Sequence, residues 1–351
     1  MSKTKAGKQK LEEDKKLPVF ADPIMDVTFK MLFGSEQNKD LLISLINSLL
    51  DFQNSMEIED LELNNNELPI SVVSDEKGGT SIASAIDILC TNKGKQKIAI
   101  EVQGQKTAYF LSREKEYMSK LISGQVKDGE GKLYYKKVLD TYIIVICKEN
   151  VFTGNTALTN QKLFELDVKP TILQTGEVYP GNMMHWKFYE LLKFKQSSIY
   201  ENICKESPLK YQWLEFLIDC SKHQVEPDRN TTIKKGYEIM KVAKWDSDTQ
   251  ALYWKQKMNA QEAEEIVDET FEKGMEKGKL KGEIKGEISK VKDFLDFGAS
   301  HEQNISKLKF LTQDKVKDKI ETNLAYIQEH LADSDSDICD ELGLVGDLLE
   351  N

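Results

Sequence analysis

The chain has 351 residues, of which 40% are hydrophobic and 30% charged, so it is long enough for one large domain or two ordinary ones with a real core. Its formal net charge of −11 excludes a global basic field, so binding to nucleic acid would need local basic patches. The longest apolar run, Ile143 to Cys147, is far too short to span a bilayer.

The cysteine and histidine content points away from disulfides and zinc. Five scattered cysteines form no CxxC pair, and the four histidines show no zinc-ligand spacing. Cysteines in apolar surroundings behave as small buried hydrophobes. We therefore expect a cytoplasmic, reducing compartment. The first 17 residues lack the apolar segment of a signal peptide.

The chain begins with a polar, highly charged stretch. Residues 1–18 show no periodicity, which predicts a disordered tail. An amphipathic helical pattern follows from Ile24 to Phe52 and breaks at Gly34-Ser35, where Ser35 is a candidate N-cap. Two helices are therefore expected before the first strand.

Alternation of apolar and polar residues at period two indicates two strands around the turn Asn92–Gln96, in which Gly94 supplies a permissive backbone. A hairpin centred on Gly94 places Asp87 opposite Glu101, with Gln103 on the same face. Opposed residues have Cβ atoms roughly 4.5–5.5 Å apart, and two carboxylates that close repel unless a proton or a cation lies between them. The pattern predicts a divalent-metal site built from oxygen ligands.

Further elements surround this hairpin. The predicted strands are Glu57–Leu63, Leu68–Ser74, Leu139–Cys147, Leu163–Asp167 and Met183–Leu191, and the predicted helix is Thr107–Val126. The first 150 residues therefore follow the order α–β–β–β–α–β, which indicates a mixed α/β sheet flanked by helices. After Lys195 the pattern becomes helical.

The C-terminal part contains a four-residue repeat, Glu272–Glu287, with glycine at positions 274, 278, 282 and 286. Each glycine costs roughly 0.8–1 kcal/mol of helix propensity relative to alanine, so an isolated helix here should fray. Two interpretations are open: a second helix packs into the glycine groove, or the segment is a loosely helical linker. The last stretch, Asp333–Asn351, has seven acidic residues and no Lys or Arg.

An ordered set of motifs resembles the Rpn group of recombination-promoting nucleases and transposases, within the PD-(D/E)XK superfamily. The motifs are Asp26–Lys30 with Phe33-Gly34, Leu41–Leu50, Asp87 with Glu101-Val-Gln103, Phe110 with Arg113 and Tyr117, His185–Phe194, Trp213–Phe216 and the glycine repeat. The likeness covers roughly residues 20–290. The whole set is far more specific than the D…ExQ pattern alone.

The resemblance implies a PD-(D/E)XK restriction-endonuclease-like core, a four-stranded mixed sheet flanked by helices, with a helical C-terminal extension. The expected divisions are a disordered tail (1–18), a nuclease-like domain (19–195), a helical region (196–271), the Gly-repeat and helical extension (272–332) and an acidic tail (333–351).

The resemblance also implies Mg²⁺- or Mn²⁺-dependent hydrolysis of DNA phosphodiesters, in recombination or mobile-element biology. Asp87 and Glu101 would hold the metal with the main-chain carbonyl of Val102, and Gln103 would position the attacking water. Such nucleases commonly carry Lys where this chain has Gln103. A neutral amide cannot take up a proton, but it can fix a water by hydrogen bonds.

Five further residues have supporting roles by the same resemblance. Asp26 would be an additional ligand or an acceptor for a metal-bound water, and Lys30 would contact phosphate; an exposed ion pair between these two residues is the alternative. Lys106 would return a positive charge to the site. Arg113 and Tyr117 would reach a phosphate, or else only pack against the sheet.

A competing hypothesis retains the nuclease scaffold without catalysis, as a DNA-binding or protein-assembly module. Gln103, the acidic net charge and the glycine repeat favour it. The expected partners are DNA and, through a coiled-coil-like association of the Gly-repeat helix, a second copy of the chain; no membrane is involved.

Overall fold

The computed structural model describes residues 18–73, 80–104, 109–125, 136, 138–152, 163–196, 205, 207–296, 313 and 319–349. The chain divides into two compact units, Met1–Lys257 and Met258–Asn351. None of the described helices is long and apolar enough to cross a membrane.

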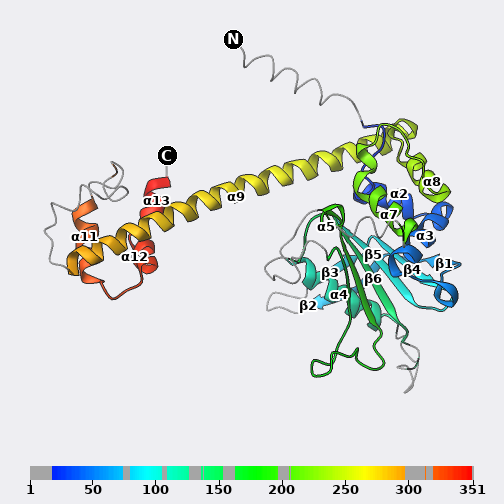
Figure 1. Cartoon of the computed structure of the whole chain (residues 1–351), viewed down its shortest axis with the longest axis horizontal. Helices are drawn as coiled ribbons and strands as arrows, with labels where there is room; N and C mark the ends of the chain where they lie inside the picture. Colours follow the sequence, from blue (N-terminus) through cyan, green and yellow to red (C-terminus); the bar gives the residue numbers. More distant parts are fainter. Residues whose placement is uncertain are drawn as a thin grey trace, which may run out of the picture. The chain divides into compact units, whose positions relative to one another are not determined.

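A six-stranded mixed sheet forms the centre of the first unit (Figure 1). Its strands, in spatial order, are β1 (Leu61–Leu63), β4 (Ile88–Asn92), β5 (Lys97–Gln103), β6 (Thr141–Cys147), β8 (Met184–Glu190) and β7 (Glu165–Val168). The neighbours β5, β6 and β8 run parallel, and the other pairs are antiparallel. The predicted mixed α/β class is confirmed, and the short edge strands β1 and β7 extend the expected four-stranded core to six.

Helices cover both faces of this sheet because the central strands are apolar on both sides. One core contains Ile98, Ile100, Ile144 and Ile146 together with the helices α2 (Asp26–Phe33), α3 (Lys39–Leu50), α7 (Pro208–Asp219) and α8 (Thr231–Met240). The other core contains Ala99, Ile143 and Val145 together with α4 (Phe110–Ser123). The helices α7 and α8 therefore belong to the same unit as the sheet.

The central hairpin has the predicted register, since Ile88 pairs with Ile100 and Thr91 with Lys97. The expectation for its turn was wrong in one detail. The left-handed residue is Lys95, with φ of 65°, and not Gly94. The side chain of Asn92 stabilises this turn by accepting a hydrogen bond of 3.0 Å from the Gln96 N–H.

The strand predicted over Glu57–Leu63 is limited to Leu61–Leu63. The side chain of Asn47 explains the shortening, because it bonds both main-chain groups of Ile58 at 2.9 Å. A residue whose N–H and C=O are taken by a side chain cannot join a strand ladder. Asn47 thus ties the end of α3 to the segment that enters the sheet.

The predicted break between the first two helices is present, but Ser35 is not a helix cap. A 3₁₀ turn, η1 (Glu36–Asn38), separates α2 from α3, and the Ser35 side chain makes no capping hydrogen bond. The helix α3 begins at Lys39 after Asn38, whose amide instead bonds the Met31 carbonyl at 2.9 Å.

A second sheet has two antiparallel strands, β2 (Glu67–Val73) and β3 (Thr80–Ala85). The strand β3 has the sequence TSIASA, whose small and polar residues gave no strand signal. It leads directly into the central hairpin and ends two residues before Asp87.

Helices form the second unit, from Met258 onward. The helix α9 runs over Ser247–Asp296 and includes all four glycines of the repeat. The shorter helices α11 (Ile320–Glu329), α12 (Asp335–Glu341) and α13 (Leu344–Leu349) pack with Ile284, Ile288 and Val291 of α9. The acidic stretch after Asp333 is therefore largely helical, and it is joined to α9 by the ion pair Lys281–Asp340 at 2.5 Å.

A buried cluster of charges joins the β7–β8 edge of the sheet to α7. Lys187 and Lys210 approach the same Glu165 oxygen at 2.5 and 3.0 Å, and both lysine side chains are less than 10% exposed. Burial alone would raise the pKa of Glu165, but the charges of Lys210 and Lys187 hold it below its ordinary value. The carboxylate of Glu165 is thus shared by two buried cations, and the half-exposed Asp51 lies 2.6 Å from Lys210 and 3.8 Å from Lys187.

We predict that Glu165→Gln lowers the free energy of unfolding by about 1–3 kcal/mol at pH 7, because it leaves buried ammonium groups undercompensated. The folded pKa of Glu165 lies below its unfolded value of about 4.3, so its contribution is complete above that pH and is lost as the pH falls through the folded pKa. Urea unfolding at pH 7 and between pH 5 and 3 measures both effects.

The exposed Glu177 provides the matched control for this substitution. Glu177→Gln should change stability by no more than about 0.5 kcal/mol. Equal unfolding curves for the Glu165 variant and wild type at pH 7 would contradict the stabilising role of the cluster.

Candidate metal centre

The strand register brings two carboxylates together at the end of the central hairpin. Asp87 directly precedes β4, and Glu101 lies on β5. The Asp87 N–H donates to Glu101 Oε2 at 3.4 Å, and the Val102 N–H donates to Asp87 Oδ2 at 2.7 Å. We call Asp87 and Glu101 the acidic pair.

Glu101 of the acidic pair is buried and Asp87 is half-buried, and their negative charge is only partly compensated. Glu101 is only 6% exposed. Burial, followed by the charges of Asp87 and Glu114, raises the pKa of Glu101 to about 8. Burial also raises the pKa of Asp87, although the hydrogen bond from Val102 opposes the rise. Such a pair is stabilised by a proton or by a cation.

Arg113 of α4 contacts both polar residues of β5. Its Nη2 atom donates to Gln103 Oε1 at 2.8 Å and lies 3.4 Å from Glu101 Oε1. Its guanidinium also lies 5.4 Å from the centre of the Phe110 ring and 5.9 Å from that of Tyr117. Arg113 therefore reaches the acidic pair and also packs on aromatic rings, and its contact with a phosphate stays a prediction.

Tyr117 lies beneath this arginine and is only 5% exposed. Burial and the negative charge of Glu101 raise the pKa of Tyr117 to about 12, so its hydroxyl is neutral at ordinary pH. Its surroundings agree with packing of the ring against the sheet.

The helix α2 places Asp26 and Lys30 beside the site. They form the expected ion pair, at 2.5 Å and with both side chains about half exposed. Partial burial would lower the pKa of Lys30, but Asp26 and the charges of the acidic pair raise it. The ion pair and the proximity to the acidic pair are thus both present. Lys106 lies outside the described residues.

Glu114 is a third acidic residue that the sequence-based interpretation missed. It is 1% exposed, and neither of its carboxylate oxygens has a hydrogen-bond partner among the described residues. Burial raises its pKa to about 7, with the charge of Arg113 opposing the rise and that of Asp87 adding to it. Its place four residues after Phe110 and three before Tyr117, both on the predicted inner face of α4, was the signal that could have revealed it.

A buried ion pair supports the same edge of the sheet. Glu190 ends β8, and its Oε1 atom accepts from the N–H groups of Val151 and Phe152 at 2.7 and 3.1 Å. Its other oxygen pairs with Lys193, and both side chains are almost fully buried. In the register of the sheet, Gln103 of β5 pairs with Cys147 of β6, and Cys147 pairs with Glu190 of β8. This part of the His185–Phe194 motif is therefore structural.

The donor set fits a hard divalent cation. Asp87 and Glu101 supply carboxylate oxygens, and the Val102 carbonyl belongs to the residue whose N–H already binds Asp87. Oxygen ligands of this kind suit Mg²⁺ and Mn²⁺. Within the described part of the chain, no three His, Cys, Asp or Glu side chains are grouped closely enough to hold an ion by themselves. A metal here would therefore need main-chain, water or substrate oxygens as well.

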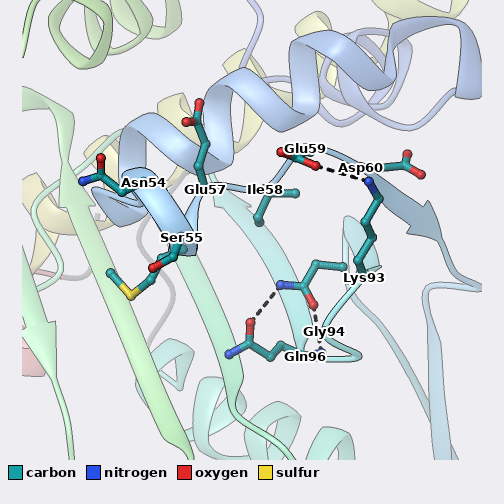
Figure 2. A pocket seen from close by; sticks show the side chains of 11 residues that line it. Asn54, Ser55, Glu57, Ile58, Glu59, Asp60, Lys93, Gly94 and Gln96 are labelled. Atoms are coloured by element: carbon teal, nitrogen blue, oxygen red, sulfur yellow. Dashed lines mark hydrogen bonds and ion pairs between the residues drawn. The ribbon is translucent and has the colours of Figure 1, made fainter.

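A separate hollow of about 490 Å³ lies at the turn end of the hairpin, away from the acidic pair (Figure 2). It is lined by the residues Asn54 to Asp60 and by Asn92, Lys93, Gly94 and Gln96. Figure 2 shows Lys93 reaching Glu59, an ion pair of 3.4 Å. None of the predicted site residues lines it.

The mixed sheet with helices on both faces and the acidic pair on its central hairpin define a PD-(D/E)XK-type α/β fold. A model of the PD-(D/E)XK nuclease family transposases matches residues 23–270. The chain therefore belongs to the PD-(D/E)XK nuclease family of transposases, and this family suggests a phosphodiester hydrolase. No curated protein and no solved structure matched the chain.

We predict that Glu114→Gln makes the free energy of unfolding less sensitive to a rise in pH through neutrality. The folded pKa of Glu114, about 7, exceeds the unfolded value of about 4.3. Wild type therefore loses stability as the pH rises from about 4.3 to 7. Between pH 5 and pH 8 the difference in unfolding free energy should shift in favour of the variant by about 1–3 kcal/mol.

Chemical denaturation at the two pH values measures this shift. Glu116→Gln on the same helix is the control, since Glu116 is 42% exposed and already paired with Lys120 at 2.8 Å. Parallel pH profiles for wild type and Glu114→Gln would rule out an uncompensated carboxyl at this position.

Proposed function

We propose that this protein is a divalent-metal-dependent DNA endonuclease that hydrolyses phosphodiester bonds in recombination or mobile-element biology. The observation that carries the proposal is the acidic pair, in which buried Glu101 accepts from the N–H of half-buried Asp87 and their like charges lack a full countercharge. Family membership supports a nuclease, and the DNA substrate follows from the transposase class.

Asp87, Glu101 and the Val102 carbonyl would hold Mg²⁺ or Mn²⁺. When bound, such an ion polarises a phosphate and lowers the pKa of a coordinated water. Gln103 orients the attacking water through its amide, and Arg113 fixes that amide by its hydrogen bond of 2.8 Å. Since Gln cannot accept the proton of the water, Gln103 is a positioning group and not a base.

Positive charge for the substrate comes from residues around the pair. Lys30 is about half exposed and lies on the helix beside the acidic pair, so it can contact a phosphate. Arg113 is 36% exposed and is the second candidate. Asp26 orients Lys30 by their ion pair or accepts from a metal-bound water. Lys106 and Tyr117 complete the proposed set, with Tyr117 acting through the packing of Arg113.

Two further partners and a compartment belong to the proposal. DNA must be held by these local cations, because the whole chain carries a net charge of −11. A second copy of the chain associates through the Gly-repeat helix. The cysteines Cys90, Cys147, Cys220 and Cys339 are buried free thiols, which suits the reducing cytoplasm.

One observation favours a second candidate, a catalytically degenerate nuclease fold that binds DNA or assembles with proteins. Position 103 carries no lysine, and Arg113 already supplies positive charge to Glu101 at 3.4 Å. A guanidinium at this place could substitute for a metal as the counterion. The two candidates differ in whether the acidic pair binds a divalent cation.

We predict that the purified chain nicks or degrades plasmid DNA with Mg²⁺ or Mn²⁺, and that Asp87→Asn or Glu101→Gln lowers the rate at least about 100-fold. These substitutions remove a ligand charge and preserve side-chain volume. Gel analysis of the plasmid, together with calorimetric titration of both metals, measures cleavage and metal binding separately.

The matched control is Asp60→Asn, an exposed carboxylate that lines the hollow of Figure 2. It should leave cleavage and metal binding unchanged. Metal binding that persists in Asp87→Asn would reject the site. A wild type that binds neither metal and cuts no DNA would support the degenerate fold.

A further inference from the structure

The helix α9 has a long uncovered stretch within the second unit. Every residue from Glu264 to Lys279 is exposed. Ile266, Val267, Phe271 and Met275 are all more than 60% exposed. In Figure 1 the helices α11, α12 and α13 gather at the C-terminal part of α9 and leave this stretch uncovered. A lone glycine-containing helix with such side chains is poorly stable in water.

Two of the exposed apolar side chains, Val267 and Phe271, lie on one stripe with the glycines. Its members recur at intervals of three or four residues: Ala263, Val267, Phe271, Gly274, Gly278 and Gly282. A Cβ atom added to any of the three glycines would meet nothing within 4 Å. The core of the second unit lies on another face of α9, which carries Ile284, Ile288 and Val291. The stripe is therefore open.

The charges on this helix are divided into two halves. Residues 258–272 contain six acidic residues and no Lys or Arg, whereas residues 273–286 contain five lysines and two glutamates. Two parallel copies would place acid beside acid and base beside base. An antiparallel pair places each acidic half along the basic half of the other copy, which is the favourable arrangement.

We propose that two copies of this chain pair antiparallel along the stripe, centred between Glu272 and Lys273. This inference rests on the self-association proposed above and adds its direction and register. With this centre, Phe271 lies level with Gly274 of the second copy, Val267 with Gly278, and Ala263 with Gly282. Each larger side chain thus meets a glycine, which lets the two backbones approach closely.

The arrangement explains the positions of the glycines, which the isolated helix does not. Nothing within the described chain requires glycine at 274, 278 or 282, since each site is open. Alanine would be the better helix former there. In the pair, both copies use the same stripe, and the residues Ala263, Val267 and Phe271 of one copy face the glycines of the other. The interface is therefore isologous.

Light scattering on the full chain tests the association. Wild type should have the mass of two chains, and Gly278→Leu should have the mass of one, because leucine fills the gap that receives Val267. Glu276→Leu is the control: it adds the same side chain to an exposed site on the opposite face of the helix. A single-chain wild type, or equal masses for wild type and Gly278→Leu, overturns the association.

Oxidative cross-linking of single-cysteine additions tests the direction. In the antiparallel pair the two copies of Phe271→Cys lie about one turn apart, within reach of a disulfide. The two copies of Val267→Cys lie roughly 16 Å apart along the helix and cannot join. Wild type gives the background, since its described cysteines are buried.

A covalent dimer that forms in Phe271→Cys and not in Val267→Cys is the expected result on a non-reducing gel. Equal cross-linking of the two variants indicates a parallel pair, and absence in both indicates another interface. Either outcome overturns the antiparallel register. The association itself would still be supported if light scattering gives wild type the mass of two chains. These measurements do not involve catalysis, so they stand apart from the nuclease assay.

Discussion

The repulsion between Asp87 and Glu101 is the constraint on which the site depends. The backbone fixes it, because the β4–β5 register aligns these residues and the hydrogen bonds from Asp87 and Val102 hold both carboxylates in place. The main chains of the two residues cannot move apart without breaking the hairpin at the centre of the sheet. Burial then keeps water from screening the charges, so the unfavourable energy persists until a proton or cation arrives.

The helix α4 adds one negative and one positive charge to the surroundings of the acidic pair. Arg113 brings one positive charge to Glu101 and Gln103. Glu114, the next residue, brings a buried negative charge that raises the pKa of Glu101 further. The described surroundings thus contain the buried carboxyl groups of Glu101 and Glu114 and the half-buried one of Asp87. Opposite them are the guanidinium of Arg113 and the ammonium of Lys30, which is already paired with Asp26. This balance explains why the raised pKa values persist despite Arg113, and why an added divalent cation is electrostatically favourable.

The sequence was sufficient to predict those elements that depend on local periodicity. The hairpin register followed from alternation around the turn, and the two-helix entry followed from the break at Gly34. Features set by distant contacts were not visible. Asn47 removes Ile58 from a strand, and the burial of Glu114 depends on the sheet that α4 covers. The sequence pattern shows that a glutamate lies on the inner stripe of a helix, but it does not show whether a hydrogen-bond or ion-pair partner lies opposite that glutamate.

The pairing of Gln103 with Arg113 bears on whether an amide at this position marks a lost activity. A lysine at position 103 would place an ammonium where the guanidinium Nη2 now lies 2.8 Å from the side-chain oxygen. Two cations that close repel, whereas an amide oxygen accepts the arginine donor. The amide and the arginine therefore act as one unit, in which the helix supplies the positive charge and the strand supplies the polar anchor. In this geometry the positive charge beside the acidic pair comes from Arg113 of α4 and not from position 103.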